Sequence, residues 1–249
     1  MESQGFFTSP KIAGGFAIKE YSGFLTEKQA MQLLQEHRQY LKELENAGIT
    51  TAQTQMHFER TPKGCKIRII QEAFDEKELV KQIIASSGRE QALKTVGIVL
   101  QAAEKAIVYS TTKNSNFGFH PSLRNFALKK GILYYIDTFP PLVSRKQVAR
   151  TIRMHSPWPK SKIARIALSP IARIAASEYY NPERMINGIL ASASRLRPEL
   201  KKEFLEAGIR TSLRVLPKKA EKIRKLAIAS IERKGYRKAV DFLKRIRRK

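Results

Sequence analysis

Apolar and polar residues alternate in the first third of the chain in a pattern that predicts short antiparallel strands. Residues 5–9 and 15–21 are runs rich in Phe and Ile, and the Pro and Gly between them are typical of a hairpin turn. Residues 55–60 and 65–71 form a second pair of strand-like runs around a Thr-Pro-Lys-Gly turn. We therefore expect two hairpins in this part of the chain.

Helical periodicity lies between and after these hairpins. Thr26 and Gln29 form a capping box, and the helix that they begin runs to Asn46, where Ala-Gly is a stop signal. Two more helices are expected near residues 75–86 and 89–108. The pattern thus predicts a small sheet with one helix inserted between its two hairpins.

The stretch GFHPSLRNFALKKGILYYIDTFPP, residues 118–141, has a different pattern. A loop that contains His120 and Asn125 leads into two short strands joined by a Lys-Gly turn, and Asp137 follows the second strand. After residue 141 the pattern is helical, with turn signals at Pro residues and no internal repeat. We assign the chain to the α+β class, with a reduced sheet half followed by a large helical half.

Charge divides the chain more sharply than hydropathy does. The protein has 47 Lys and Arg against 22 Asp and Glu, a formal net charge of +25. Residues 142–249 hold 29 basic and 8 acidic residues, whereas residues 1–141 hold 18 and 14. A field of this sign attracts polyanions, and nucleic acid is the commonest one in a cytoplasm. The positive charge of the helical half therefore predicts a nucleic-acid partner. An acidic protein and an anionic lipid surface are the alternatives.

The remaining composition indicates a globular cytoplasmic protein. The single Cys65 excludes an internal disulfide bond and is typical of a reducing compartment. No uncharged apolar run reaches the roughly 18 residues of a membrane span. The start, MESQGFFTSP, does not resemble a secretory signal, and no pattern points to an obligate protein partner.

Three side chains of the 118–141 stretch are candidates for metal and phosphate chemistry. Asn125 and Asp137 would supply the hard oxygen ligands that a cation bridging phosphates requires. His120 would orient or deprotonate an acceptor hydroxyl, because an imidazole accepts a proton near neutral pH. The structural alternative makes Asn125 a turn residue and Asp137 a cap at the end of a strand.

The segment FAIKEYSG, residues 16–23, resembles the V-A-I-K strand of the protein-kinase-like fold. By this resemblance Lys19 would pair with the α and β phosphates of ATP. Glu36 lies seventeen residues on, in the inserted helix, and would hold Lys19 in place. Taken singly, an edge-strand lysine and a solvated helical glutamate are the alternatives.

The same resemblance extends to residues 118–141. Protein kinases have H-R-D, four residues and Asn, then a short hairpin and D-F-G, and Asn125 and Asp137 match the two Mg²⁺ ligands in identity and order. The chain departs from the family at His120, which stands where kinases have their catalytic Asp. It also departs near Gly5, because only Ser3-Gln4-Gly5 precedes the first recognisable strand, so the strand that usually begins the phosphate-covering loop is missing or supplied otherwise.

Within this superfamily, the short first half and the lack of an A-P-E segment after Asp137 resemble the atypical, RIO-like kinases. With its basic helical half, the chain is similar to the archaeal RNA kinases, which phosphorylate a uridine 2'-hydroxyl in tRNA. The motifs cover residues 1–141, and the remainder matches by charge and helicity. The implied organisation is a kinase-like sheet lobe over residues 1–74 and a helical lobe over residues 75–249, with residues 142–249 binding RNA.

The resemblance implies further contacts. ATP and Mg²⁺ would bind between the two lobes, with the adenine against Glu72 and Phe74 in the connection after the second hairpin. The basic residues that follow Asp137 directly would contact tRNA or another structured RNA nearest the site. They are Arg145, Lys146, Arg150 and Arg153.

The predicted function is ATP-dependent transfer of the γ-phosphate to a ribose 2'-hydroxyl of tRNA. Two other interpretations stay open. One is an RNA-binding pseudokinase, in which the change from Asp to His120 has removed catalysis. The other is a kinase that acts on protein Ser or Thr, or on a small molecule, for which the basic charge would be incidental.

Overall fold

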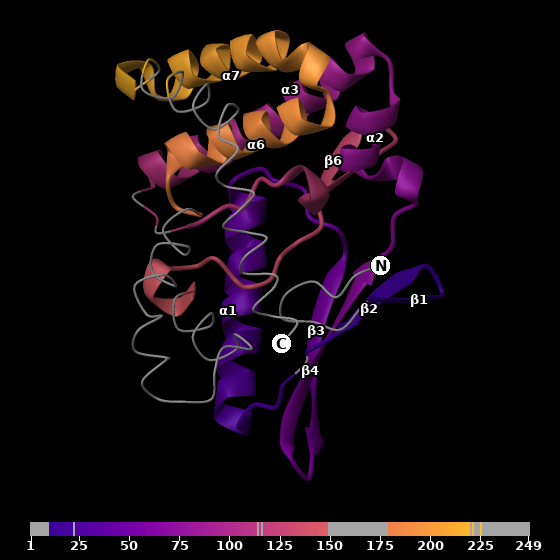
Figure 1. The fold of residues 1–249 in the computed structure, drawn as a ribbon. Coiled ribbons are helices and arrows are strands. Elements are labelled where there is room, and N and C mark those ends of the chain that lie inside the picture. Colours follow the sequence, from indigo (N-terminus) through magenta and orange to yellow (C-terminus); the bar gives the residue numbers. More distant parts are fainter. Residues whose placement is uncertain are drawn as a thin grey trace, which may run out of the picture.

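The computed structural model describes residues 10–21, 23–113, 115, 117–148, 179–219, 221 and 225. In these ranges the chain is an α+β protein, as its pattern predicts. An antiparallel sheet and one long helix occupy one end, and a layer of helices covers the other end (Figure 1). No helix within the described ranges is long and apolar enough to cross a membrane.

The sheet has four antiparallel strands in the order β1-β2-β4-β3. Its second hairpin confirms the predicted strand pair, with Thr61 opposite Gly64 at the turn. This arrangement places β2 and β4, the two central strands, side by side although the long helix separates them in the sequence. The strands are β1 Lys11–Ala13, β2 Phe16–Glu20, β3 Thr54–Thr61 and β4 Gly64–Glu72.

The first hairpin lies later in the chain than its prediction. The strand expected at residues 5–9 falls outside the described residues, and the strand that pairs with β2 begins at Lys11. Ala13 faces Phe16, so the turn is Gly14-Gly15, with φ of +57° and +79°. Two consecutive positive φ angles favour Gly at both positions of a tight turn, and this Gly pair therefore sets the register.

The helix between the hairpins, α1 (Glu27–Asn46), begins as predicted. Thr26 Oγ1 accepts a hydrogen bond from Gln29 N at 3.3 Å, and Gln29 Oε1 accepts one from Thr26 N at 2.9 Å. This reciprocal pair satisfies two backbone donors that a helix start leaves without intrahelical partners. Beyond the other end, Gly48 has a φ of +69°, which Gly adopts with little strain.

The helices after the sheet follow the prediction in part. The single helix expected over residues 75–86 is divided at Leu79, whose ψ of 124° is extended because Leu79 bridges to Ala127. The helix expected over residues 89–108 continues to Thr112. The helical segments are η1 Glu76–Glu78, α2 Val80–Ser86, α3 Arg89–Thr112, α6 Pro182–Leu196, η3 Pro198–Leu200, α7 Lys201–Val215 and η4 Pro217–Lys219.

The predicted hairpin within residues 118–141 is confirmed. The strands β5 (Phe126–Lys129) and β6 (Ile132–Tyr135) pair around Lys130-Gly131, two residues with positive φ. A 3₁₀ turn, η2 (Leu123–Asn125), leads directly into β5. The loop, the turn and the hairpin therefore follow one another as their sequence signals predict.

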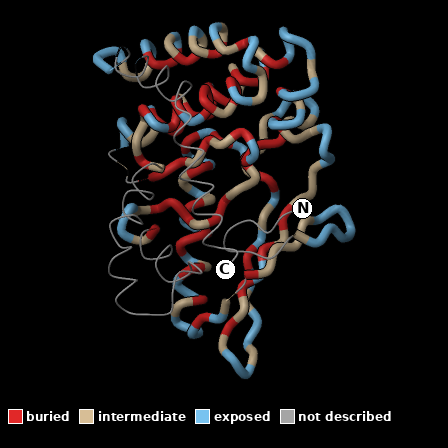
Figure 2. The backbone as a smooth tube through the Cα atoms, viewed as in Figure 1, coloured by how far each residue is buried: buried red, intermediate tan, exposed pale blue. Residues whose placement is uncertain are grey.

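Two hydrophobic cores share α1, and buried backbone positions occur in both the sheet end and the helical end of the fold (Figure 2). Leu33, near the start of α1, packs with Ile67 of β4 in the core between α1 and the sheet, which we call the core below the sheet. Phe139 joins this core from the segment after β6. Tyr40 and Leu44, farther along α1, belong to the larger core of the helical layer. The same helix thus anchors both halves, and residues on its flank can reach from one to the other.

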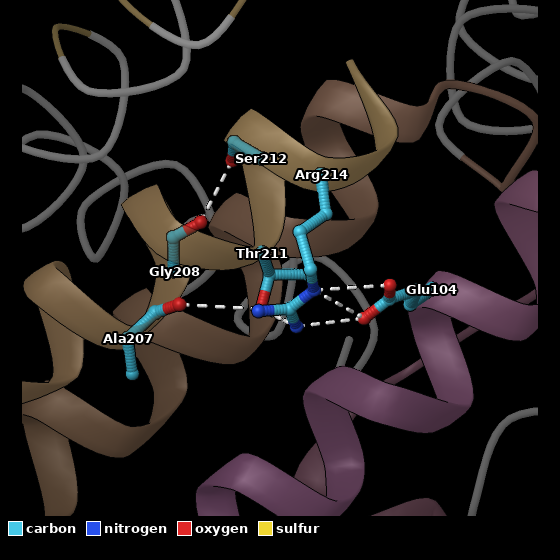
Figure 3. Close-up of polar contacts among 6 residues, drawn as sticks. All are labelled: Glu104, Ala207, Gly208, Thr211, Ser212 and Arg214. Atoms are coloured by element: carbon cyan, nitrogen blue, oxygen red, sulfur yellow. Dashed lines mark hydrogen bonds and ion pairs between the residues drawn. The ribbon is translucent and has the colours of Figure 1, made fainter. Parts of the chain in front are cut away.

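The helices α3, α6 and α7 form a closely packed layer. Gly208 of α7 lies against α6, and a Cβ at this position would stand 2.3 Å from Leu190 Cδ1. Arg214 of α7 binds Glu104 of α3 through Nε and Nη2, at 3.1 and 2.8 Å (Figure 3). Two buried hydroxyls of α7 donate to carbonyls of the same helix, Thr211 to Ala207 and Ser212 to Gly208 (Figure 3).

Candidate functional site

Lys19 lies on the face of β2 that is turned toward the core below the sheet. Its Nζ donates a hydrogen bond to Gln71 Oε1 at 3.3 Å, and Gln71 Nε2 donates to Thr54 Oγ1 at 2.8 Å. Gln71 is buried at the end of β4. In the described part of the chain Lys19 has no acidic partner, so a neutral amide holds its ammonium group.

Glu36 does not make the contact that the resemblance implies. The side chain is buried on α1, and its Oε1 accepts a hydrogen bond from Gln147 Nε2 at 3.4 Å. Lys19 and Glu36 therefore have different partners, because Lys19 is held by Gln71 and Glu36 faces the short helical segment after Asp137. The expected ion pair between Lys19 and Glu36 is not formed in this structure.

His120 and Asn125 lie together in the loop before β5. Asn125 Nδ2 is 3.0 Å from the carbonyl oxygen of His120 and 3.2 Å from His120 Nδ1. The backbone N–H of Asn125 donates to Ser122 O, and its carbonyl accepts from Ile136 N, both at 2.8 Å. Asn125 is buried, and these bonds fix the start of β5 beside the end of β6.

The contact with the His120 carbonyl determines which way the Asn125 amide points. A carbonyl oxygen only accepts hydrogen bonds, so the Asn125 atom beside it must be the NH₂ group. The Oδ1 atom is then the remaining polar atom of the side chain, and within the described residues it accepts no hydrogen bond. Asn125 can therefore offer this oxygen to a cation.

Asp137 lies two residues after the end of β6 and is half-buried. Thr138, the next residue, pairs through Oγ1 with His37 Nε2 of α1 at 3.0 Å. Phe139 packs below the sheet, with its ring 6.3 Å from the ring of Tyr21. Tyr21 lies two residues after Lys19, and alternate residues of a strand share a face. The segment that carries Asp137 therefore passes beneath the sheet face that carries Lys19.

Two histidines near this segment are shifted toward their neutral forms. Burial lowers the pKa of His120 below its ordinary 6.5, the negative charge of Asp137 opposes this effect, and the positive charge of Arg124 adds to it. Burial also lowers the pKa of His37, from 6.5 to about 4. Asp137 therefore lies near enough to His120 for its charge to act on the imidazole.

Two aromatic residues form a wall beside His120. Tyr179 O accepts a hydrogen bond from Phe119 N at 2.8 Å, and the Tyr179 ring lies 4.7 Å from the His120 ring. A Cβ on Gly118 would stand 2.8 Å from the Tyr180 ring, so this position requires Gly. Tyr179 and Tyr180 thus pack against the loop that holds His120, and the guanidinium of Arg145 lies over the Tyr180 ring at 5.6 Å.

The two residues predicted to contact adenine also contact the β5–β6 hairpin. Glu72 forms an ion pair of 2.9 Å with Lys129, and the Phe74 ring lies 5.3 Å from the Tyr134 ring. The intervening Ala73 donates its N–H to Gly15 O at 2.9 Å. This connection therefore links the sheet to the hairpin, and an adenine here would contact residues that already hold each other in place.

The predicted RNA-binding residues are only partly within the described ranges. Arg145 and Lys146 are exposed on the segment that follows Asp137. Arg150 and Arg153 lie outside the described residues, as does Gly5. The prediction for these three positions is therefore neither supported nor opposed by the fold.

The oxygen ligands fit a cation that is shared with phosphates rather than a cation held by protein alone. The described residues contain no group of three His, Cys, Asp or Glu side chains that would hold a metal ion. Mg²⁺ is commonly bound by one or two protein oxygens together with substrate phosphates and water. Asn125 Oδ1 and the Asp137 carboxylate are suited to that arrangement.

Three residues, Gln71, Gln147 and Thr138, make contacts in this site that were not predicted from the sequence. Gln71 is a polar residue in the buried register of β4 that also contains Ile67 and Ile69, and this mismatch is a signal that the sequence carries. Gln147 and Thr138 have no comparable signal, because their partners on α1 are 111 and 101 residues away.

Comparison with known proteins assigns the chain to a family but supplies no activity. No curated protein matches the sequence. The chain matches the family described as "Family of unknown function (DUF6206)" over residues 8–243, which is nearly its whole length. The protein therefore belongs to this family.

Proposed function

We propose that this protein is an ATP-dependent kinase with the two-lobe, protein-kinase-like fold. Its acceptor is a ribose 2'-hydroxyl of tRNA or another structured RNA. One observation carries the proposal: Asn125 and Asp137 flank the β5–β6 hairpin, and the segment after Asp137 passes beneath the sheet face that carries Lys19. The segment that carries one candidate cation ligand, Asp137, thus packs against the sheet face that carries the candidate phosphate-binding amine.

The order of the elements supports the same assignment. In protein kinases the strand that carries the phosphate-binding Lys precedes a helix, and the metal-binding Asn and Asp flank a later hairpin. Here β2 carries Lys19 and precedes α1, and β5 and β6 separate Asn125 from Asp137. The presence of two cores joined by α1 supports a two-lobe organisation, and the boundary at residue 74 stays a prediction.

The charge of Lys19 is available to an anion. Its amine is held by the neutral amide of Gln71, so no described carboxylate neutralises it. In contrast, Glu20, the next residue along β2, binds Lys66 and Arg68 at 2.8 and 3.0 Å. A preorganised amine without an acidic partner is suited to bind phosphate oxygens.

In the proposed mechanism each residue has a distinct task. Lys19 binds phosphate oxygens of the nucleotide, and Asn125 and Asp137 supply oxygen ligands. When bound, Mg²⁺ would neutralise charge that develops on the transferred phosphoryl group. His120 lies next to Asn125 and contacts the acceptor hydroxyl. Phosphoryl transfer tolerates the absence of a strong base at this position, because its loose transition state depends mainly on positioning and charge neutralisation.

The choice of RNA as acceptor depends on charge. Residues 142–249 hold 29 basic and 8 acidic residues. Arg145 and Lys146 are exposed at the start of this half, a few residues from Asp137. RNA offers phosphates to these cations and 2'-hydroxyls as nucleophiles.

An acceptor survey tests this proposal. The full chain would be incubated with γ-labelled ATP and Mg²⁺ together with total tRNA, a protein extract or a pool of sugars. We expect label in tRNA, and nuclease digestion followed by mass spectrometry would locate the phosphate on a ribose. Label in protein or in sugars alone would show that the acceptor is not RNA. Label in none of the pools would contradict the kinase proposal.

A second candidate function is RNA binding without phosphate transfer. The observation that favours it is the separation of Lys19 from Glu36, which bind Gln71 and Gln147 respectively. A protein of this kind would bind tRNA in a filter assay and would transfer no label. The same incubation therefore separates the two functions.

A further inference from the structure

The hydrogen bonds around Asn125 determine more than the position of the loop. Its NH₂ group has two hydrogens and two neighbours, the carbonyl oxygen of His120 at 3.0 Å and His120 Nδ1 at 3.2 Å. The carbonyl contact requires NH₂ at this position, which excludes the alternative orientation of the amide. The second hydrogen of the NH₂ group is then directed to Nδ1.

An amide nitrogen cannot accept a hydrogen bond, so Nδ1 of His120 must be the acceptor in this pair. A neutral imidazole has one protonated nitrogen and one with a lone pair. We propose that Asn125 holds His120 as the neutral tautomer with its proton on Nε2. His120 then acts as a hydrogen-bond donor to the reacting oxygens and not as the base that removes the acceptor proton.

The surroundings of the ring agree with this tautomer. The negative charge of Asp137 acts on His120 and would stabilise the positive end of an N–H group of its ring. The Tyr179 ring, 4.7 Å away, covers the imidazole. Within the described residues no carboxylate forms an ion pair with His120, so no acidic partner draws the proton to Nδ1.

This role depends on the proposed kinase activity and gives it a specific chemistry. The acceptor hydroxyl oxygen forms a bond to the γ-phosphorus, and the bond between that phosphorus and the bridging oxygen breaks, leaving its electron pair on ADP. The hydroxyl proton passes to a non-bridging oxygen of the transferred phosphoryl group and then to water. Nε2–H of His120 donates to the acceptor oxygen or the phosphoryl group throughout, so it positions the acceptor without titrating.

The tautomer can be measured without any activity. Long-range ¹H–¹⁵N correlation spectra of the ¹⁵N-labelled full chain distinguish a protonated from an unprotonated ring nitrogen. The chain has four histidines, and His120→Gln identifies the signals of His120 by their loss. We expect a protonated Nε2 and an unprotonated Nδ1 at neutral pH. A proton on Nδ1 or on both nitrogens would overturn the inference.

Asn125→Asp provides the matched reversal. A carboxylate accepts hydrogen bonds only, so the variant should draw the imidazole proton to Nδ1 and leave a lone pair on Nε2. Tautomer signals that are identical in the parent and in this variant would contradict the assignment to Asn125. His57, which is exposed on β3, is the internal control and should keep its spectrum in both proteins.

Transfer assays then test the donor role. The Nε2 amide of Gln lies near the position of histidine Nε2 and donates a hydrogen bond, so His120→Gln should retain most of the transfer rate. His120→Ala should lose about 10² to 10³-fold, the loss typical of removing one donor aimed at developing charge. If His120→Gln is as slow as His120→Ala while His120→Asp is fast, a base acts here and the donor role is wrong. A parent chain that transfers no phosphate would refute the kinase proposal and leave the tautomer result standing.

Discussion

Two cations of this protein are held in opposite ways. Arg214 of α7 binds the Glu104 carboxylate through two nitrogens, and the pair joins two helices of the layer (Figure 3). Lys19 of β2 donates one hydrogen bond of 3.3 Å to the neutral amide of Gln71. The first cation has an acidic partner between two packed helices, and the second has a neutral partner on the sheet face of the candidate site.

The same contrast extends to other cations of the helical half. Arg89 of α3 pairs with Glu203, and Lys219 pairs with Glu183, so at least one of the cations of residues 142–249 is used within the fold. The exposed pair of Arg89 and Glu203 contributes little stability. Lys19 differs from these cations because its described partner is a neutral amide, and this difference supports the proposal that it binds an external anion.

The largest expected effect is on the charge of Lys19. Lys19→Met keeps most of the stem and removes the ammonium, and we expect phosphate transfer to fall by about 10²-fold or more. Lys105→Met is the matched control, because Lys105 also has a neutral partner, Gly48 O at 3.0 Å, but lies on α3. Equal transfer rates for the two variants would show that Lys19 takes no part in phosphate transfer.

Acidification tests the contact between α1 and the segment after Asp137. His37 is neutral in the fold, with its pKa lowered from 6.5 to about 4, whereas the unfolded chain is protonated below about 6.5. The free energy of unfolding should therefore fall as pH drops from about 6.5 to about 4, by about 3 kcal/mol at 1.36 kcal/mol per pH unit.

Urea unfolding at several pH values measures this effect. His37→Gln keeps a group able to bond Thr138 and does not titrate, so the difference between the parent and this variant should shrink or reverse toward pH 4. His57→Gln, at an exposed position of β3, should follow the parent curve. Parallel curves for the parent and His37→Gln would show that His37 is not held neutral.

A third prediction concerns the packing of the helical layer. Gly208→Ala would place a Cβ 2.3 Å from Leu190 Cδ1, and such overpacking should lower the free energy of unfolding by about 1 to 3 kcal/mol. Gly188→Ala on α6 is the control, since no atom lies within 4 Å of its Cβ and Ala favours a helix. A gain in stability in both variants would mean that helix propensity, and not close packing, decides the outcome.

The smallest effect is expected at the ion pair itself. Arg214 is about half exposed, so a double-mutant cycle with Arg214→Gln and Glu104→Gln should give a coupling energy of about 1 kcal/mol or less. Neither variant should change phosphate transfer. If Arg214→Gln or Glu104→Gln lowered transfer as much as Lys19→Met does, Arg214 and Lys19 could not be separated into a structural and a functional cation.

Local signals made much of the fold predictable from the sequence. The Thr26 capping box, the Pro-Lys-Gly turn and the Lys130-Gly131 turn each depend on neighbouring residues, and all three are found where the pattern places them. The helix expected over residues 75–86 is broken because Leu79 pairs with Ala127, a partner far along the chain. Long-range pairing can thus override a helical pattern.

The candidate site was predictable in part for the same reason. The spacing of Asn125, the hairpin and Asp137 is local, and the fold has that order. The partners of Lys19 and Glu36 lie 52 and 111 residues away, and no pattern in the sequence indicates them. The resemblance to kinases supplied the wrong partner, because it implied an ion pair that the hydrogen bonds to Gln71 and Gln147 replace.

Asp137 provides the most direct test of the central claim that these residues form a phosphotransfer site. The transfer of label from γ-labelled ATP to total tRNA would be measured for the parent and for Asp137→Asn, which keeps the side-chain volume and removes one charge. We expect the variant to lose transfer almost completely and to bind tRNA with nearly the affinity of the parent, because the change removes a cation ligand and no basic residue. Full transfer activity in Asp137→Asn would contradict the account.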